Sequence, residues 1–307
     1  MDIVIVGPTA SGKTALAIEV ANRLSAPIIS ADARQCYIGM DIGTAKPSAE
    51  ELSQARHFNV SILQPNQKDD AAAFVSRVAR WKQEHHHPHW VIVGGSTLYL
   101  QSLLFPLDDI PKSDPSILAQ IEADIQVHGL QHAWDRLQVL DPVYAKQMDG
   151  LNHQRIVRAL CVCIQTDKPF STFHRREGFS DPQDALVFGL NMDRDLLVKR
   201  INDRVDHMIA SGLVDEVRNL VASGYDRNSY SMKTVGYAEV LDFLDGSISH
   251  EQMVEQIKAH TRQYSRRQLT WFRRWSFIQW INIADVSLQQ TAGFIVDRLL
   301  SVETQRK

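Results

Sequence analysis

The sequence predicts an α/β fold, in which a parallel sheet flanked by helices carries an inserted all-helical subdomain. Over the first hundred residues, short apolar segments alternate with helical patterns, as they do in successive βαβ units. Between residues 114 and 166 the apolar side chains recur only at helical spacing. A strand-like segment at residues 186–191 then returns the chain to the sheet. We therefore expect two parts: a core of residues 1–110 and 186–307, and a helical insertion of residues 111–185.

Each expected element follows from the spacing of its apolar residues. Leu16, Val20 and Leu24 share one face of a first helix, and Ile117, Ile121 and Ile125 repeat every four residues in the insertion. The expected strands are residues 2–6, 27–30, 57–63, 90–93 and 186–191. The expected helices are residues 13–24, 71–83, 155–164, 195–210, 214–222 and 251–275.

Composition excludes several classes of protein. The chain has 307 residues, of which 44% are hydrophobic, and a formal net charge of −3, so it can bury a large core and does not coat nucleic acid indiscriminately. It contains no apolar run long enough to span a membrane, and its first residues lack the basic segment of a secretory signal. We expect a cytoplasmic protein.

Cysteine and histidine patterns do not predict a metal site. The three cysteines, Cys36, Cys161 and Cys163, lack the spacing of metal ligands, and we interpret all of them as packing residues. Four histidines at 85–87 and 89 surround Pro88 just before an expected strand, which is more typical of a solvated turn than of a metal centre.

The strongest local motif lies between the first strand and the first helix. It consists of Gly7, Pro8, Thr9, Ala10, Ser11, Gly12, Lys13 and Thr14. This pattern is a P-loop, so the expected fold is P-loop NTPase-like. Its backbone N–H groups would bind phosphate oxygens, Lys13 would neutralise their charge, and the Thr14 hydroxyl would bind Mg²⁺. The strand at 90–93 is followed by Gly94-Gly95-Ser96 rather than by the acidic residue that binds the metal in many ATP hydrolases. This difference argues against routine ATP hydrolysis.

Asp32 is the best candidate for a catalytic carboxylate. It directly follows the second strand, and ligands of open α/β sheets bind beyond the carboxyl ends of the strands. The alternative role is that of a helix cap or turn residue. The neighbouring residues 41–47 are rich in turn formers and, by themselves, would be a surface loop.

Basic residues gather near the C-terminus. No acidic residue occurs between 256 and 284, and on a helix Arg262, Arg266 and Arg273 lie near one face. Tyr264, Trp271 and Trp275 lie near another face. Such a helix either binds nucleic acid phosphates or is simply a solvated amphipathic helix, and composition leaves both alternatives open. Two arginine pairs, Arg155 with Arg158 and Arg200 with Arg204, are by spacing alone more typical of solvated faces and salt bridges.

In combination, four motifs resemble those of the tRNA dimethylallyltransferases, and the resemblance runs nearly end to end. The motifs are the P-loop, Gly39-Met40-Asp41-Ile42-Gly43-Thr44-Ala45-Lys46-Pro47, Val235-Gly236-Tyr237, and Arg267-Gln268-Leu269-Thr270-Trp271-Phe272-Arg273. The resemblance implies transfer of a dimethylallyl group from dimethylallyl diphosphate to N6 of adenosine-37, beside the tRNA anticodon. Pyrophosphate is the leaving group, and the adenine would be flipped out of the loop.

The resemblance also implies roles for individual residues. Asp32 would be the general base, while Lys13, Arg204 and Mg²⁺ at Thr14 would stabilise the pyrophosphate, with Ser96 completing the catalytic set. The implied tRNA contacts are Asp32, Ala33, Arg34, Gln35, Gln154, Arg155, Arg158, Lys233, Gly236, Tyr237, Arg266, Arg267, Gln268, Trp271 and Arg273. The implied partners are the anticodon stem-loop of tRNA and dimethylallyl diphosphate, bound to a monomer.

Ala33, Ser96 and Leu118 depart from the family pattern, and Arg34 fills a position that the pattern leaves open. Relatives commonly have Asp-Ser-x-Gln where this chain has Ala33 and Arg34, and Gly-Gly-Thr where it has Ser96, which keeps the hydroxyl. Ala33 loses a hydroxyl, and Arg34 adds a charge at the mouth of the expected channel. Leu118 stands where relatives carry an arginine, and we assign it no role.

Three other functions remain open at the level of sequence. They are a P-loop kinase of a small metabolite or nucleotide, a prenyltransferase that acts on free AMP, and a nucleotide-dependent RNA-binding protein without chemistry. The basic, aromatic C-terminal helix and the insertion favour a tRNA substrate over the first two, and a catalytic Asp32 would exclude the third.

Overall fold

The chain forms two compact units in a computed structural model that describes residues 1–105, 108–174, 179–283 and 286–306. Unit 1 comprises Met1–Phe105 and Phe179–Lys307, and unit 2 comprises Pro106–Gly178. The division thus falls after residues 105 and 178, whereas the sequence placed it after 110 and 185. The reason is aromatic packing, because the ring of Phe179 lies 5.1 Å from that of Phe105 and 5.8 Å from that of Trp275.

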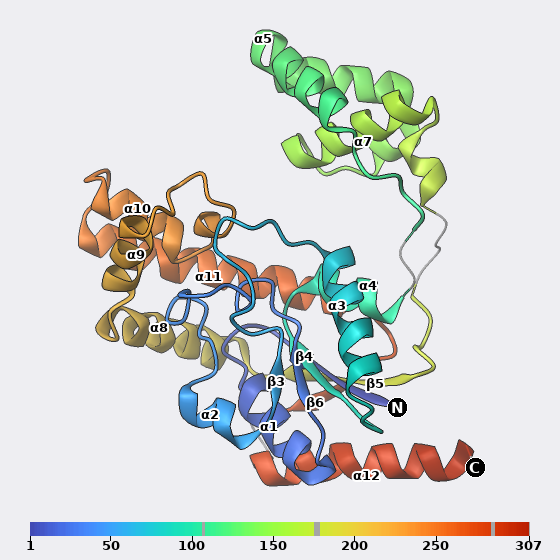
Figure 1. Cartoon of the computed structure of the whole chain (residues 1–307), viewed down its shortest axis with the longest axis vertical. Coiled ribbons are helices and arrows are strands. Elements are labelled where there is room, and N and C mark those ends of the chain that lie inside the picture. Colours follow the sequence, from blue (N-terminus) through green and yellow to red (C-terminus); the bar gives the residue numbers. More distant parts are fainter. Residues whose placement is uncertain (106–107, 175–178, 284–285, 307) are drawn as a thin grey trace. The chain divides into compact units, whose positions relative to one another are not determined.

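Unit 1 is built on a six-stranded, wholly parallel sheet (Figure 1). The strand order is β3-β2-β4-β1-β5-β6. The strands are β1 (Asp2–Val6), β2 (Ile28–Ser30), β3 (His57–Phe58), β4 (Val91–Gly94), β5 (Ala185–Asn191) and β6 (Gln279–Asn282). Val6, the last residue of central β1, pairs with Gly94 on one side and Gly189 on the other. Both glycines allow close packing, because a Cβ at Gly94 would lie 2.1 Å from the carbonyl oxygen of Ala31 and one at Gly189 would lie 2.6 Å from Ile278.

Helices cover both faces of the sheet because both faces are apolar. Ile3 and Ile5 pack with α1 (Lys13–Leu24) and α12 (Leu288–Arg306), which lie together in Figure 1. Val4 and Val6 point to the opposite face, where they pack with α3 (Ala71–Glu84) and α4 (Thr97–Leu104). This alternation is the period-two pattern of a strand buried on two sides.

A helical cluster completes unit 1. It contains α8 (Arg194–Ala210), α9 (Leu213–Ala222), α10 (Tyr237–Leu244), α11 (His250–Phe272) and the 3₁₀ turn Ser231–Lys233. The short helix α2 (Ala49–Gln54) lies against α1 instead. Val205, Val217, Val240 and Ile257 form the apolar centre of the cluster. Cys36, Tyr37 and Met40, which follow β2, are buried in the same centre. The helical cluster thereby fixes the chain immediately after Asp32.

Unit 2 is wholly helical in its described residues. It contains α5 (Pro115–Leu140), α6 (Pro142–Lys146), α7 (His153–Thr166) and the 3₁₀ turn Phe170–Phe173. Its core is apolar, with Ile121, Leu137, Ile156 and Leu160 almost fully buried. Gly129, at φ 83°, interrupts the helical backbone of α5.

Most expected strands and helices are confirmed, and two were too long. The strand expected at 57–63 ends at Phe58 because Asn59 and Ser61 have φ values of 65° and 50°, outside the β region. The long C-terminal helix ends at Phe272 rather than at residue 275. We had not predicted α2, α4, α10, α12 or β6.

The cysteines have the packing role that the sequence predicts. All three cysteines are buried and free. In the histidine turn, the ring of His89 is bonded to the backbone carbonyl of Met1. Among the described residues, no helix combines the length and apolar character required to cross a bilayer.

Candidate active site

The P-loop connects β1 to α1 in a conformation that presents its backbone outward. Gly12 is the N-cap of α1 at φ 84°, a left-handed conformation that favours glycine. The Nζ of Lys13 donates to the carbonyl of Pro8 at 2.6 Å, so the amine folds back over the loop. The N-terminus of α1 adds a positive partial charge at the same place. The turn predicted from the sequence is therefore formed between β1 and α1, with Lys13 folded over it.

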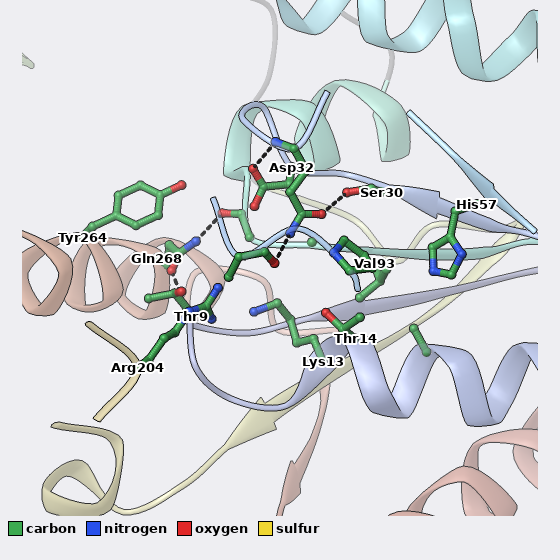
Figure 2. A pocket seen from close by; sticks show the side chains of 16 residues that line it. Thr9, Lys13, Thr14, Ser30, Asp32, His57, Val93, Arg204, Tyr264 and Gln268 are labelled. Atoms are coloured by element: carbon green, nitrogen blue, oxygen red, sulfur yellow. Dashed lines mark hydrogen bonds between the residues drawn. The ribbon is translucent and has the colours of Figure 1, made fainter. Parts of the chain in front are cut away.

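Two cations face the same cavity. Lys13 and Arg204 of α8 both line a pocket of about 80 Å³ at the carboxyl edge of the sheet (Figure 2). Burial and the charge of Arg204 lower the pKa of Lys13 to about 7, although Asp32 opposes the shift. Within the described residues, Arg204 makes no hydrogen bond or ion pair, and its guanidinium stays charged at neutral pH. Two basic side chains and the carboxylate of Asp32 therefore share this cavity, and the negative charge of Asp32 acts on both of them.

Asp32 lies in the same pocket at the end of β2. Its Oδ1 accepts a hydrogen bond from the backbone N–H of Arg34 at 2.8 Å, which fixes the carboxylate while leaving Oδ2 available. The next peptide is fixed as well, because the N–H of Ala33 donates to the hydroxyl of Ser96 at 2.8 Å. The turn therefore holds one carboxylate oxygen rigidly in a cavity that also contains the two cations.

Gln35 ties this turn to the loop at residues 41–47. Its Oε1 accepts from the Ser30 hydroxyl at 2.9 Å, and its Nε2 donates to the carbonyl of Ala45 at 3.1 Å. The 41–47 loop is anchored from the other side by Glu216, which accepts from the N–H groups of Asp41, Ile42 and Gly43. A segment that resembled a plain surface loop is thus part of the wall of the site.

Gln268 of α11 joins the P-loop to the end of β4. Its Oε1 accepts from the N–H of Thr9 at 2.9 Å, and its Nε2 donates to the carbonyl of Gly95 at 2.9 Å. A Cβ at Gly95 would lie 2.1 Å from that amide nitrogen, so the contact requires glycine there. We had predicted a tRNA contact for Gln268, but its side chain is buried and both ends of its amide are used within the protein. Its role here is to position the P-loop.

A second, larger cavity adjoins the first. It has a volume of about 310 Å³, and four residues line both cavities: Thr9, Asp32, Arg204 and Tyr264. Its wall is mostly apolar and is formed by residues that include Val205, Met208, Val235 and Ile257. The site therefore consists of a cationic compartment and an apolar compartment, with the carboxylate of Asp32 at their junction.

Two residues of the site were not assigned a role from the sequence. His57, at the start of β3, lines the smaller cavity with its Nδ1 bonded to the Ala55 carbonyl, and burial lowers its pKa. Tyr264 lines both cavities, and burial together with the charge of Asp32 raises the pKa of its hydroxyl to about 12. The sequence placed Tyr264 on an aromatic face of the helix without indicating that this face meets the P-loop.

Several predicted tRNA contacts lie around the mouth of the larger cavity. Lys233 and Gly236 line it, and so do Ala33 and Arg34, whose guanidinium lies over the ring of Tyr230 at 5.4 Å. Tyr237, in contrast, has no exposed surface, and its hydroxyl donates to Glu216 at 2.6 Å. Tyr237 thus supports the wall from behind and presents no surface to a tRNA.

The basic residues of α11 divide between two sides of the helix. Arg266 and Arg273 line an open groove of about 660 Å³ between α8 and α11, where Arg194 and Arg262 add further positive charge. Arg267 is exposed, and the ring of Trp271 lies 5.3 Å below the guanidinium of Arg274. Of the expected aromatic face, Trp275 belongs to the core, since it is only 1% exposed.

In unit 2, the predicted contacts differ in their availability. Gln154 and Arg155 are exposed near the start of α7. Arg158 instead donates to the carbonyl of Pro111 at 2.7 Å and to the hydroxyl of Ser113. The side chain of Arg158 therefore stabilises the beginning of the insertion.

Comparison with known proteins identifies the family. A family model described as IPP transferase matches residues 35–275. Curated tRNA dimethylallyltransferases of Geobacter metallireducens and Oceanobacillus iheyensis are 41% and 36% identical to the chain, over 95% and 98% of its length and 96% of theirs. The chain belongs to the IPP transferase family. It is thus a tRNA-modifying prenyltransferase by family, as its sequence motifs predicted.

Solved structures agree with this assignment. The tRNA isopentenylpyrophosphate transferase of Bacillus halodurans is 34% identical to this chain. The match covers 99% of this chain and 98% of that enzyme, with a TM-score of 0.72. The corresponding enzyme of Staphylococcus epidermidis is 36% identical. Its match covers 98% of this chain and 99% of that enzyme, with a TM-score of 0.70. A eukaryotic dimethylallyltransferase acting on tRNA, at 23% identity and a TM-score of 0.81, shares the fold over 97% of this chain and 79% of its own. The expected P-loop NTPase-like fold is confirmed.

Proposed function

We propose that this prenyltransferase uses dimethylallyl diphosphate as donor and attaches the dimethylallyl group to N6 of adenosine-37 in the anticodon stem-loop of tRNA. The cationic compartment takes the diphosphate and the apolar compartment takes the flipped adenine. The observation that carries this assignment is the position of Asp32 at the junction of the two compartments, opposite Lys13 and Arg204.

The arrangement suits a displacement at an allylic carbon. As the bond from carbon to the bridging oxygen breaks, negative charge grows on the pyrophosphate, where Lys13, Arg204 and the P-loop N–H groups stabilise it. The N6 amine attacks the carbon and loses a proton to Asp32 while the new bond forms, because an aryl amine is too weak an acid to ionise beforehand. In this step one C–O bond breaks, one C–N bond forms, and the proton passes to the carboxylate of Asp32.

Mg²⁺ fits the oxygen donors of the cationic compartment. The Thr14 hydroxyl lines both the smaller cavity and the outer opening of the P-loop, and it makes no hydrogen bond to a described residue. Mg²⁺ prefers hard oxygen ligands and substrate phosphates, and when bound it would supply further charge for the departing pyrophosphate. We therefore assign Mg²⁺ to Thr14, and we propose that the protein acts as a cytoplasmic monomer.

The test is a reaction with purified components. Incubation with dimethylallyl diphosphate, Mg²⁺ and a tRNA that carries adenosine-37 should yield N6-dimethylallyladenosine, which mass spectrometry of the digested tRNA detects. Free AMP and a tRNA with guanosine at position 37 serve as controls. Modification of AMP with unmodified tRNA would refute the tRNA assignment, and ATP hydrolysis without prenyl transfer would favour the kinase alternative.

The groove between α8 and α11 predicts a separate effect on tRNA affinity. Arg266→Ala should weaken binding of the stem-loop by about 3–10-fold and reduce the slope of log affinity against log salt by about one, because one phosphate contact is lost. Filter binding at several salt concentrations measures both quantities.

Arg80→Ala is the matched control for that measurement. Arg80 is 61% exposed on α3 and lies 3.8 Å from Glu84, so its removal deletes one surface charge outside the groove. The salt slope should stay at the wild-type value in Arg80→Ala. An equal change in both variants would show that Arg266 acts only through net charge.

A further inference from the structure

Tyr264 meets Asp32 at the junction of the two compartments. Among the residues that the structure describes, three besides Tyr264 line both cavities, and none of these three is aromatic. Figure 2 shows the phenol oxygen directed from α11 toward the carboxylate of Asp32. The ring is 40% exposed, but its hydroxyl end is inside the site, one helical turn before the buried Gln268.

The hydroxyl of Tyr264 is a hydrogen-bond donor at every physiological pH. Burial and the negative charge of Asp32 raise its pKa to about 12, so the phenol is protonated. The side chains of Ser96 and Gln268 partly oppose this rise in the pKa. Gln268 is itself bonded to Thr9 and Gly95, and the Ser96 hydroxyl accepts from Ala33. The protonated phenol, which lines both cavities, can therefore donate to a ligand.

A carboxylate acceptor beside a phenol donor matches the Watson–Crick edge of adenine. That edge presents the N6 amine as a donor and N1 as the adjacent acceptor. Guanine presents the reverse, a carbonyl oxygen at position 6 and an N1–H group, which would place acceptor against acceptor and donor against donor. The mismatch would leave buried polar groups unpaired, which costs more than a missing contact.

We propose that Tyr264 reads N1 of the target adenine by donating its hydroxyl proton, while Asp32 accepts from N6. The pair selects adenine and orients the amine toward the allylic carbon. This inference rests on the proposed function, since it concerns the acceptor base of that reaction. Tyr264 therefore contacts the substrate directly and sets base specificity together with Asp32.

A chemical double-mutant cycle tests the contact. Two stem-loops that carry either adenosine or 1-deazaadenosine at the target position are compared in wild type and in Tyr264→Phe, with single-turnover rates as the readout. Any intrinsic change in the reactivity of the 1-deaza base is common to both proteins and cancels in the ratio. The wild-type preference for adenosine over 1-deazaadenosine should exceed that of Tyr264→Phe by about 3–10-fold, the effect of one hydrogen bond.

The controls separate this inference from other outcomes. Tyr225→Phe removes a hydroxyl bonded to Gln64 at 2.8 Å outside both cavities, and it should show the wild-type ratio. Equal ratios in wild type and Tyr264→Phe, with active wild type, would overturn the inference while leaving the proposed function intact. A wild type that modifies neither stem-loop would refute the proposed function itself. Because the ring is partly exposed, Tyr264→Phe should keep the wild-type melting temperature.

Discussion

Asp32→Ala should lower the single-turnover rate of prenyl transfer by about 10²–10⁴-fold, the usual contribution of a general base, while the affinity for the stem-loop changes by less than about twofold. The expectation follows from the position of the carboxylate, which shares its cavity with Lys13 and Arg204. Only its Oδ1 accepts from the Arg34 N–H, so Oδ2 can accept the proton of the amine. Rapid-quench kinetics with saturating protein gives the rate, and filter binding gives the affinity.

Asp32→Asn separates chemistry from geometry in that experiment. The asparagine amide oxygen can still accept from the N–H of Arg34, so the turn after β2 keeps its conformation. It cannot accept a proton from the N6 amine, and its rate should therefore be as low as that of the alanine variant. A near-normal rate in Asp32→Asn would remove Asp32 from the role of base. Equal loss of tRNA affinity in both variants would assign it to binding instead.

Local patterns explain which parts of the fold could be predicted. The strand before the P-loop and the helix after it were both placed correctly, because Val and Ile in β1 and the spacing of Leu16, Val20 and Leu24 are properties of the segments themselves. β6 gave no such indication. It is a four-residue edge strand whose side chains are alternately half-buried and exposed, and only pairing with β5 makes it a strand.

The same distinction holds for the site. The P-loop could be predicted because its eight residues are consecutive and form the turn by themselves. The place of Asp32 in the cavity could be predicted because it lies just beyond the carboxyl end of β2. The hydrogen bond from Thr9 to Gln268 could not be predicted, since the two residues are 259 positions apart in the sequence. Tyr264 shares this limitation, because the spacing of aromatics on α11 shows that they lie on one face but not that this face closes the P-loop cavity. Contacts between distant segments depend on how helices pack against the sheet.

Lys13→Ala should produce the second large loss, a decrease of about 10²–10³-fold in the single-turnover rate, comparable to the removal of one donor from an oxyanion site. Lys13 stabilises charge that appears only as pyrophosphate departs, so the rate falls more than the affinity for dimethylallyl diphosphate. Arg204→Ala leaves the P-loop lysine in place and is expected to be impaired less. A rate for Lys13→Ala within about threefold of wild type would show that the P-loop lysine does not act on the leaving group.

Pyrophosphate binding adds a pH signature to the same variant. The pKa of Lys13 is about 7 in the free protein and rises when an anion binds, so binding above pH 7 takes up a proton. Affinity for pyrophosphate should therefore fall by up to about tenfold per pH unit from pH 7 upward, until the pKa of the bound state is reached, while below pH 7 the amine is already charged and contributes no slope. Calorimetry in buffers of different ionisation enthalpy measures the proton uptake directly. Lys13→Ala should lose this uptake, and a variant that retained it would place the titrating group elsewhere in the cavity.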